Sequence, residues 1–446
     1  MATIPIYHAT IVPPVTGAMS TEYFQTFLDT TMNSTSGELV SILDHGKMVL
    51  VWREGIPVIS PVLSWEQIGQ LIDNGFICDI DASGNRIVIG SLQLGGSSTR
   101  VYDWDGTNWV QLGNTITGTY TLFGNDYNVG AGGAISGDGT WLSIRSVYTN
   151  DPGDAVSVVL MFNWDGINWV LKSVLQGTGG SFDIFGYTIT FNSLDGLDSR
   201  LVIGGVGGDS NNYGEVYGYK LENQSGTLRW IQRDTVTGQE PGEIGRSLSV
   251  GSDRTIIGNP TGTDINENVV GSVQFSTFNT GGGTVPLYGE NDGDKFGDSV
   301  SINEAGTRCA IMAKLAIVSE VKVYDLDGIN WIQVGNTIEV PIQSVTNFTD
   351  VIVKLNAAGD RLAIAADTNW EPNNPSGAQI VIKTFKLVDN NWEQFGSDIL
   401  GSDNVDWNTT DIGMNAAGDR IVFRSFGNNF TPEPGSDVRV YSLESQ

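Results

Sequence analysis

A turn pattern of the form Asn/Asp-x-x-Gly-x-Arg recurs along most of the chain and constrains its fold more strongly than any other feature. The clearest copies are NAAGDRLAI, which begins at Asn356, and NAAGDRIVF, which begins at Asn415. The residue at the Arg position recurs at intervals of 53 to 59 residues: Arg86, Trp141, Arg200, Arg254, Arg308, Arg361 and Arg420. Each interval has room for four short strands. Seven such units predict an all-β, closed seven-bladed β-propeller.

A tryptophan-containing hairpin recurs within the same period. DWDGTNWVQLG from Asp103 returns as NWDGINWVLKS from Asn163, as DLDGINWIQVG from Asp325 and as KLVDNNWEQFG from Lys386, and a looser copy surrounds Trp230. An Asp-Gly pair between two β-rich runs is a strong hairpin signal. We therefore expect each copy to form the outer hairpin of a blade, with its indole covering the gap to the neighbouring blade.

The last repeat lacks this tryptophan strand, because the chain ends at DVRVYSLESQ. A matching segment occurs near the other end of the chain, where SWEQIGQLID from Ser64 to Asp73 places Trp65 as the counterpart of Trp109 and Trp392. We expect this segment to supply the outer strand of the last blade. Such pairing would close the ring and remove its open edge.

The sequence divides into a propeller over residues 62–446 and an N-terminal arm over residues 1–61, which does not match the repeat. In the arm, STEYFQTFLDTTM from Ser20 has the pattern of a short helix, and the segment from Lys47 to Ser60 that of a hairpin turning at Glu54-Gly55. An attachment segment and a cap packed on the propeller are both compatible with this composition.

Composition and charge set limits on the binding partners. The chain has 446 residues, of which 57 are Gly and 17% are charged, and its formal net charge is -28. A surface with that charge repels phosphate backbones, so we expect no nucleic-acid partner. No apolar run is long enough to span a membrane. The first residues lack the basic and apolar regions of a signal peptide, so we expect a soluble protein. Cys78 and Cys309, the two cysteines, are expected to be buried free thiols.

Several segments resemble a known group of repeats. Phe296-Gly297 with the following DSVSINEAGTRCAI, and Phe185-Gly186 with its following strand, resemble the FG-GAP repeats of integrin-alpha-type seven-bladed propellers. The W-D-G-x-x-W-x-x-x-G pattern is similar to that of propeller proteins of marine bacterial surfaces and large algal viruses. The resemblance covers about residues 62–446 and implies a surface-exposed interaction protein. In this sequence Ile244 replaces the Phe of one copy, and the unit containing GGGTVPLYG from Gly281 lacks the Trp.

Calcium is the one cofactor that the sequence suggests. Integrin-like blades often hold calcium in a D-x-D-x-D-G loop, and no stretch here matches that pattern fully. GENDGDKFGD places Asp292, Asp294 and Asp298 close together and is the better calcium candidate. Asp103 and Asp105 of DWDG could also act as ligands, but the hairpin-turn interpretation is favoured there.

The sequence favours a protein without catalytic activity. Its two histidines, His8 and His45, lie outside the ring, so a Ser-His-Asp or Cys-His centre cannot be built on the blades. SGDGTW at Ser136 resembles the Asp-box of sialidase-type propellers, which is itself a structural turn. The recurring arginines are expected to pair with turn carbonyls or acids. A pair of carboxylates could form a glycosidase site, but no particular pair stands out.

A binding surface is predicted on the variable loops between the second and third strands of the blades. These loops place aromatic residues beside Asn and Asp, as sugar-binding and protein-binding loops do, although solvated loops without a partner have a similar composition. The candidate binding residues are Tyr148, Asp151, Tyr213, Asp264, Trp370, Glu371 and Phe430.

These observations favour a non-enzymatic structural or interaction protein on the surface of a virion or similar particle. Its loop face would contact another protein or a host, and residues 1–61 would provide particle attachment or homo-oligomer contacts. A lectin-like adhesin that binds a surface glycan and a carbohydrate-active enzyme are the alternatives. The alternative location is extracellular, without a recognisable signal peptide.

Overall fold

The computed structural model describes residues 37–44, 47–54 and most of 63–445. The gaps in the last range are 74, 76, 94–95, 123–124, 130–132, 150–154, 178–183, 207–213, 239–242, 278–283, 316–317, 342–350, 368–379, 402–411 and 427–435. The chain divides into two compact units, one of Met1–Val62 with Ser445–Gln446 and the other of Leu63–Glu444.

In the first unit the described residues form one antiparallel hairpin. β1 (Gly37–Asp44) pairs with β2 (Lys47–Glu54), so the connection between them lies at residues 45–46. The predicted turn at Glu54-Gly55 stays a prediction, because residues 55–60 lie outside the described residues; the strand that begins at Lys47 pairs with the segment before it. The helix predicted from Ser20 lies outside the described residues.

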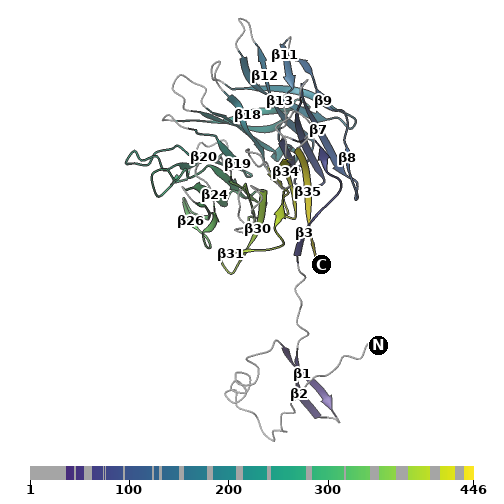
Figure 1. Cartoon of the computed structure of the whole chain (residues 1–446), viewed down its shortest axis with the longest axis vertical. Helices are drawn as coiled ribbons and strands as arrows, with labels where there is room; N and C mark the ends of the chain where they lie inside the picture. Colours follow the sequence, from purple (N-terminus) through teal and green to yellow (C-terminus); the bar gives the residue numbers. More distant parts are fainter. Residues whose placement is uncertain are drawn as a thin grey trace. The chain divides into compact units, whose positions relative to one another are not determined.

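The second unit consists of seven antiparallel sheets that follow one another around a common centre in chain order (Figure 1). The predicted seven-bladed β-propeller is confirmed. The first blade contains β5 (Ile77–Ile80), β6 (Arg86–Gln93), β7 (Gly96–Trp104), β8 (Trp109–Gln111) and β9 (Ile116–Thr117). The second blade contains β10 (Thr119–Leu122), β11 (Asn125–Val129), β12 (Trp141–Thr149), β13 (Ala155–Trp164) and β14 (Trp169–Gln176). The third blade contains β15 (Ile184–Phe191), β16 (Arg200–Val206), β17 (Glu215–Gln224) and β18 (Thr227–Thr237).

The next three blades keep this order of strands. The fourth blade contains β19 (Ser247–Val250), β20 (Arg254–Asn259), β21 (Ser272–Thr277) and β22 (Leu287–Tyr288). The fifth blade contains β23 (Ser299–Ile302), β24 (Arg308–Lys314), β25 (Val318–Asp327), β26 (Asn330–Gln333) and β27 (Ile338–Pro341). The sixth blade contains β28 (Val351–Leu355), β29 (Arg361–Asp367), β30 (Ile380–Val388), β31 (Asn391–Gln394) and β32 (Ile399–Leu400). One 3-10 turn, η1 (Gly196–Asp198), precedes β16 in the third blade.

The seventh blade combines the two ends of the propeller sequence. It contains β33 (Ile412–Met414), β34 (Arg420–Phe426) and β35 (Ser436–Ser445), with β3 (Leu63–Gln67) and β4 (Ile72–Asp73) as its outer strand. Ile72 lies opposite Val438 in the register, and the N–H of Ile68 donates to the carbonyl of Val440 at 2.9 Å. The outer strand of the last blade therefore comes from the segment around Trp65.

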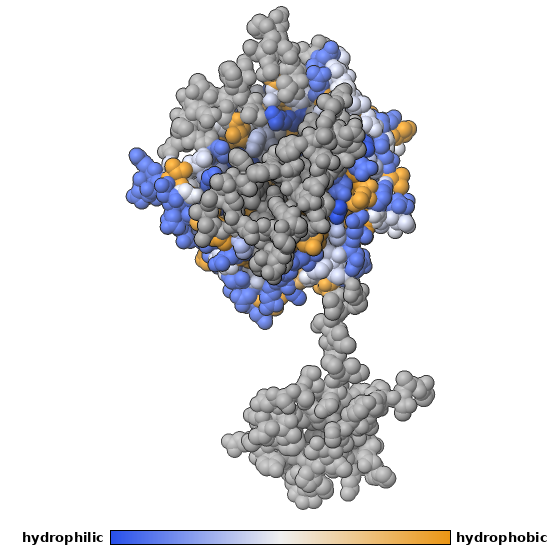
Figure 2. All heavy atoms as spheres, viewed as in Figure 1, coloured by the Kyte–Doolittle hydropathy of each residue, from blue (hydrophilic) through white to orange (hydrophobic). Residues whose placement is uncertain are grey.

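The hydrophobic core lies between neighbouring blades. One cluster joins Met312 of the fifth blade to Ile364 and Trp392 of the sixth, and another joins Trp65 of the seventh blade to Ile382 of the sixth. Each blade thus buries both faces of its sheet, which accounts for the apolar second strands. Elsewhere, exposed apolar residues form small separate groups among hydrophilic ones on the face seen in Figure 2.

Both cysteines belong to this interior. Cys78 and Cys309 are buried and have free thiols, as the sequence analysis predicted. Burial raises the pKa of the Cys309 thiol well above its usual value. Within the described part of the chain, no helix has the length and apolar character that crossing a membrane requires.

Candidate functional site

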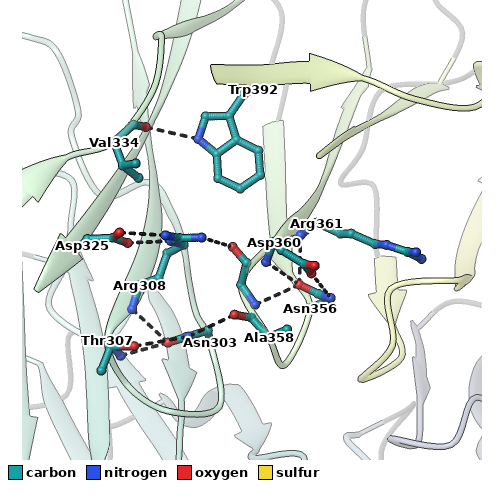
Figure 3. Close-up of polar contacts among 11 residues, drawn as sticks. Asn303, Thr307, Arg308, Asp325, Val334, Asn356, Ala358, Asp360, Arg361 and Trp392 are labelled. Carbon is teal, nitrogen blue, oxygen red and sulfur yellow. Dashed lines mark hydrogen bonds and ion pairs between the residues drawn. The ribbon is translucent and has the colours of Figure 1, made fainter. Parts of the chain in front are cut away.

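The recurring arginine joins each regular blade to the next. Arg308 Nε and Nη2 donate to the two oxygens of Asp325 in its own blade, at 2.5 and 2.7 Å. Its Nη1 donates at 2.9 Å to the carbonyl of Gly359, in the turn of the following blade (Figure 3). We call this bond from an arginine to the next blade's glycine an arginine latch. The prediction that these arginines pair with turn carbonyls or acids is correct for Arg308, and the carbonyl belongs to the neighbouring blade.

The same latch occurs at five of the seven blade junctions. The donor and acceptor pairs are Arg86 with Gly139, Arg254 with Gly306, Arg308 with Gly359, Arg361 with Gly418, and Arg420 with Gly84. A turn-to-turn backbone bond accompanies each latch, from Ala82 to Gly137, from Ser252 to Glu304, from Glu304 to Ala357, from Ala357 to Ala416, and from Ala416 to Ala82. These turns therefore form a continuous chain of contacts along most of one face of the ring.

The spacing of the repeat follows from the turn itself. Asn303 Oδ1 accepts the N–H groups of Thr307 and Arg308, each at 2.9 Å (Figure 3). Gly306 lies in the same turn at φ +67°, where a side chain would be strained. The local geometry thus requires Asn at the start of the turn, Gly three residues later and Arg two residues after the Gly.

The tryptophans form a second connection at the outer rim. Trp392 Nε1 donates to the carbonyl of Val334 in the preceding blade at 3.2 Å (Figure 3). The next residue, Gly335, has φ +77°, and a Cβ there would lie 2.7 Å from Trp392 Cδ1. The W-x-x-x-G spacing therefore places a glycine where the indole of the following blade rests. Equivalent bonds join Trp169 to Leu112 and Trp109 to Ile68.

Trp65 takes part in the same series of contacts. Its Nε1 donates to Thr384 Oγ1 in the sixth blade at 2.9 Å, and its indole lies over Gly396. Its own segment receives the next tryptophan, because Trp109 of the first blade bonds to the carbonyl of Ile68 at 3.3 Å. The N-terminal strand therefore contacts both neighbours of the seventh blade.

The acids of the DWDG copies serve the fold. Asp103 forms an ion pair with Arg86 at 2.6 Å. Asp105 accepts the backbone N–H groups of Asn108 and Thr107, and these two hydrogen bonds lower the pKa of its carboxyl. The structure supports the hairpin-turn interpretation of this motif.

The three acids of the predicted calcium loop have separate hydrogen-bonding roles. Asp294 is buried and accepts two backbone N–H groups of its own loop. Asp292 accepts the N–H of Val269 at 3.0 Å, and Asp298 pairs with Arg246 at 3.2 Å. Within the described ranges, no three Asp, Glu, His or Cys side chains are grouped as a metal ion would require. This arrangement gives the calcium prediction no support.

Of the predicted loop residues, Asp264 is placed with its side chain. Its carboxylate accepts the side-chain amide and backbone N–H of Asn268 and the N–H of Asn266, and these bonds lower the pKa of Asp264. Tyr148 lies within β12, but its side chain is outside the described residues. Asp151, Tyr213, Trp370, Glu371 and Phe430 also lie outside them. The loop-face prediction thus stays a prediction.

A cavity of about 1010 Å³ lies on the propeller axis, between the inner strands of the blades. All seven blades contribute to its wall, through Ile80, Val129, Ile189, Val250, Ile302, Ile352 and Gly413. Among the residues that the structure describes, its charged lining comprises four cations and two acids: Arg145, Arg246, Lys354, Arg424, Asp79 and Glu304. This balance is opposite to the net charge of the chain, which is -28.

The two acids are both engaged by neighbouring blades. Asp79 of the first blade accepts the N–H of Ile135 in the second at 3.0 Å. Glu304 of the fifth blade accepts the N–H of Ser193 in the third at 2.8 Å and also bonds to its hydroxyl. Burial raises the pKa of Glu304, against the lowering effect of the bonds to Ser193.

Three of the lining residues, Arg145, Tyr187 and Arg246, cluster where the second, third and fourth blades meet. Arg145 of β12 packs beside Gly186 at the start of the third blade. Tyr187 follows this glycine, and its hydroxyl lies 3.4 Å from Arg246 Nη1. The sequence analysis missed this group. Its signal would have been an alignment of the repeats. The second strands of five blades carry Gly90, Gly204, Gly258, Met312 and Ala365 at the position where the second blade has Arg145 and the seventh has Arg424.

Comparison with known proteins adds no family assignment. No protein-family model matches the sequence, and no curated protein does either. Among solved structures, the chain is similar to the Dos1 propeller, with 12% identity and a TM-score of 0.46 over 85% of this chain and 95% of that one. It is also similar to a candidate 6-phosphogluconolactonase from Bacteroides fragilis, with 12% identity and a TM-score of 0.43 over 83% and 92%. A protein from Lactobacillus plantarum gives 10% identity and 0.45 over 82% and 93%.

These likenesses are too distant to transfer an activity or a binding partner. The geometry of the blades alone identifies the architecture. The chain is a seven-bladed β-propeller built from a latched repeat.

Proposed function

We propose that this protein is a non-enzymatic binding scaffold on the surface of a virion or similar particle. Its loop face contacts another protein or a host surface, and residues 1–61 attach it to the particle. The observation that carries this proposal is the use of the repeated polar residues. Arg308, Asp325 and Asn303 are all occupied in joining or shaping blades. A ring held in this way can present loops of any sequence without losing its fold.

The cavity acids support a scaffold rather than a hydrolase. Asp79 and Glu304 come from different blades, and each accepts a backbone N–H of another blade. A glycosidase needs one carboxyl to donate a proton and a second to act as base or nucleophile. Here both carboxylates have structural acceptor roles, which favours binding over catalysis.

The resemblance to FG-GAP repeats is consistent with a surface role. Phe185 and Phe296 are buried, and Ile244 occupies the equivalent buried position in the fourth blade. The glycines that follow them have φ between +83° and +90°. The Phe-Gly pair therefore has the same structural function in three consecutive blades, including the copy in which Ile replaces Phe.

Copurification tests the proposal most directly. The full chain and a chain lacking residues 1–61 would be expressed in parallel, and the proteins that copurify with each would be identified. We expect a particle or capsid component with the full chain and its loss from the shortened one. Equal recovery with both chains would place attachment elsewhere.

Two assays separate the alternatives. Binding on a glycan array would favour the lectin-like adhesin, and the absence of binding at any pH would exclude it. Polysaccharide turnover that disappears in Asp79→Asn or Glu304→Gln, with the fold intact, would overturn the non-enzymatic assignment. We expect no turnover by the unaltered chain.

A further inference from the structure

We propose that the axial cavity holds a binding site for a small molecule with a carboxylate or phosphate group. Arg145 is the residue that makes the main contact with the bound anion, and Tyr187 and Arg246 complete the site. This inference is independent of the particle-surface role, because it concerns the cavity between the inner strands and not the loops or residues 1–61. It rests on the position of one arginine, a bulge that directs a tyrosine, and the charge of the wall.

The first step is the position of Arg145 in the second strand of its blade. At the equivalent position of the third blade, a Cβ on Gly204 would lie 2.5 Å from the carbonyl of Gly245 in the next blade. At that of the fourth blade, a Cβ on Gly258 would lie 2.1 Å from the carbonyl of Gly297. These close approaches explain the glycines. The second blade carries Arg145 at the same position, and the seventh blade carries Arg424, which also lines the cavity. The packing of the repeat does not require a long cationic side chain there.

The second step is a local irregularity in the neighbouring strand. The register of β15 against β16 shifts between Phe185 and Thr188, so a bulge lies at Gly186 and Tyr187. Bulges often occur beside binding sites, because they change the direction of a side chain. Tyr187 lines the cavity and remains 43% exposed. Its hydroxyl can donate a hydrogen bond to an anion bound beside Arg145.

The third step is the charge balance around the arginines. Arg246 is neutralised by Asp298 at 3.2 Å and by Glu243 at 3.4 Å, and it holds the Tyr187 hydroxyl at 3.4 Å. Arg145 forms no ion pair with any residue in the described ranges. Burial lowers the pKa of its guanidinium, but an arginine stays charged at neutral pH. A half-buried cation with no acidic partner among the described residues favours an anion in the adjacent cavity.

The described part of the wall has the same preference. Lys354 and Arg424 add two further cations, and the acids Asp79 and Glu304 are engaged by Ile135 and by Ser193 of other blades. A cluster of one sign inside a concave wall raises the local concentration of ions of the opposite sign. The planar guanidinium of an arginine matches the oxygens of a carboxylate or phosphate. The volume of about 1010 Å³ is sufficient for a ligand of metabolite size.

Isothermal titration calorimetry on the full chain at low salt tests the site. Inorganic phosphate and citrate serve as separate probes, so the two arms distinguish phosphate from carboxylate recognition. We expect at least one of them to bind in a single-site isotherm. Arg145→Gln should weaken that binding by about tenfold or more, and Arg145→Lys by less, because lysine keeps the charge but loses the planar fork.

Two further variants keep the test decisive. Arg233→Gln is the matched control, because it removes the same charge as Arg145→Gln but at an exposed site, where Arg233 pairs with Glu222 outside the cavity. It should bind the probe within about twofold of the unaltered chain. Tyr187→Phe removes one hydroxyl and should weaken binding by about threefold to tenfold, even if Arg145→Gln fails to fold. The proposal is overturned if neither probe binds, if Arg145→Gln and Arg233→Gln behave alike, or if Tyr187→Phe has no effect.

Discussion

The junctions of the ring fall into two classes. Five of them have an arginine latch and a turn-to-turn backbone bond. These are the junctions of blades four and five, five and six, six and seven, seven and one, and one and two. The two junctions on either side of the third blade differ. Trp141 stands at the arginine position of the second blade and packs edge-on against Trp230 at 5.7 Å. Arg200 of the third blade donates to carbonyls of its own turn.

This difference shows which residues the fold requires and which it does not. At the regular junctions the polar side chains of the repeat are used in blade-to-blade contacts, so they leave little for a ligand. At the irregular junctions Trp141 replaces the arginine of the second blade and Arg200 of the third blade bonds within its own turn. Glu304 also reaches Ser193 from two blades away. Arg145, Tyr187 and Arg246 lie at these same junctions. Departures from local consistency are where function is expected.

Removal of the closing strand should have the largest effect. A chain that begins at residue 62 should keep a cooperative thermal transition, because it retains every strand of the second unit. A chain that begins at residue 74 loses β3 and β4, and with them the contacts of Trp65 and Ile68 to both neighbouring blades. We expect the latter to lose cooperative unfolding in calorimetry. Equal transitions in the two chains would show that the ring does not depend on this strand.

The second-largest loss of stability is expected from the tryptophan contacts at the outer rim. Trp392→Ala should lower the free energy of unfolding by about 3–5 kcal/mol, because it empties a buried site between two blades. Gly335→Ala should cost at least about 1–2 kcal/mol, since its φ is +77° and the added methyl meets that indole. Denaturant unfolding measures both. Gly106→Ala is a control for conformation alone, because no atom lies within 4 Å of the added methyl.

The arginine latch should give an intermediate effect. Arg308→Gln should destabilise the protein by roughly 1–3 kcal/mol, because it removes bonds to Asp325 and to Gly359. A double-mutant cycle of Arg308→Gln with Asp325→Asn should show a clear coupling energy. The exposed pair of Arg233 and Glu222 supplies the comparison, with a coupling of about 0–0.5 kcal/mol. Equal couplings would contradict a special role for the latch.

Glu304 should give the smallest effect, visible as a pH dependence. Burial raises the pKa of its carboxyl in the folded state, so the folded protein holds a proton that the unfolded chain has already released. Its contribution to stability therefore falls as the pH rises from the ordinary carboxyl pKa through the raised one. Glu304→Gln should remove this slope, so the difference in stability between Glu304→Gln and the unaltered chain should grow across that range. A difference that stays constant with pH would contradict this account.

Much of the architecture could be predicted from the sequence, because each repeated residue has a local physical cause. The interval between arginine positions predicted the blades, and the match between Trp65 and Trp392 predicted the outer strand of the seventh. The pairing of the segment after Lys47 with the strand before it was not predicted, because alternating apolar residues give no indication of which segment they pair with. The axial cluster could not be found by motif, since Arg145 and Tyr187 belong to different blades and lie far apart from any shared sequence pattern.

Hydrogen exchange of the closing strand is the most direct test of the central claim, that the repeat forms one ring joined through residues 63–73. Peptides covering 63–73 and 436–444 would be followed in the native protein by mass spectrometry. We predict that both segments are protected and that they exchange together, because Ile68 bonds to Val440 and Ile72 pairs with Val438. Rapid exchange of residues 63–73 while 436–444 stays protected would contradict this account.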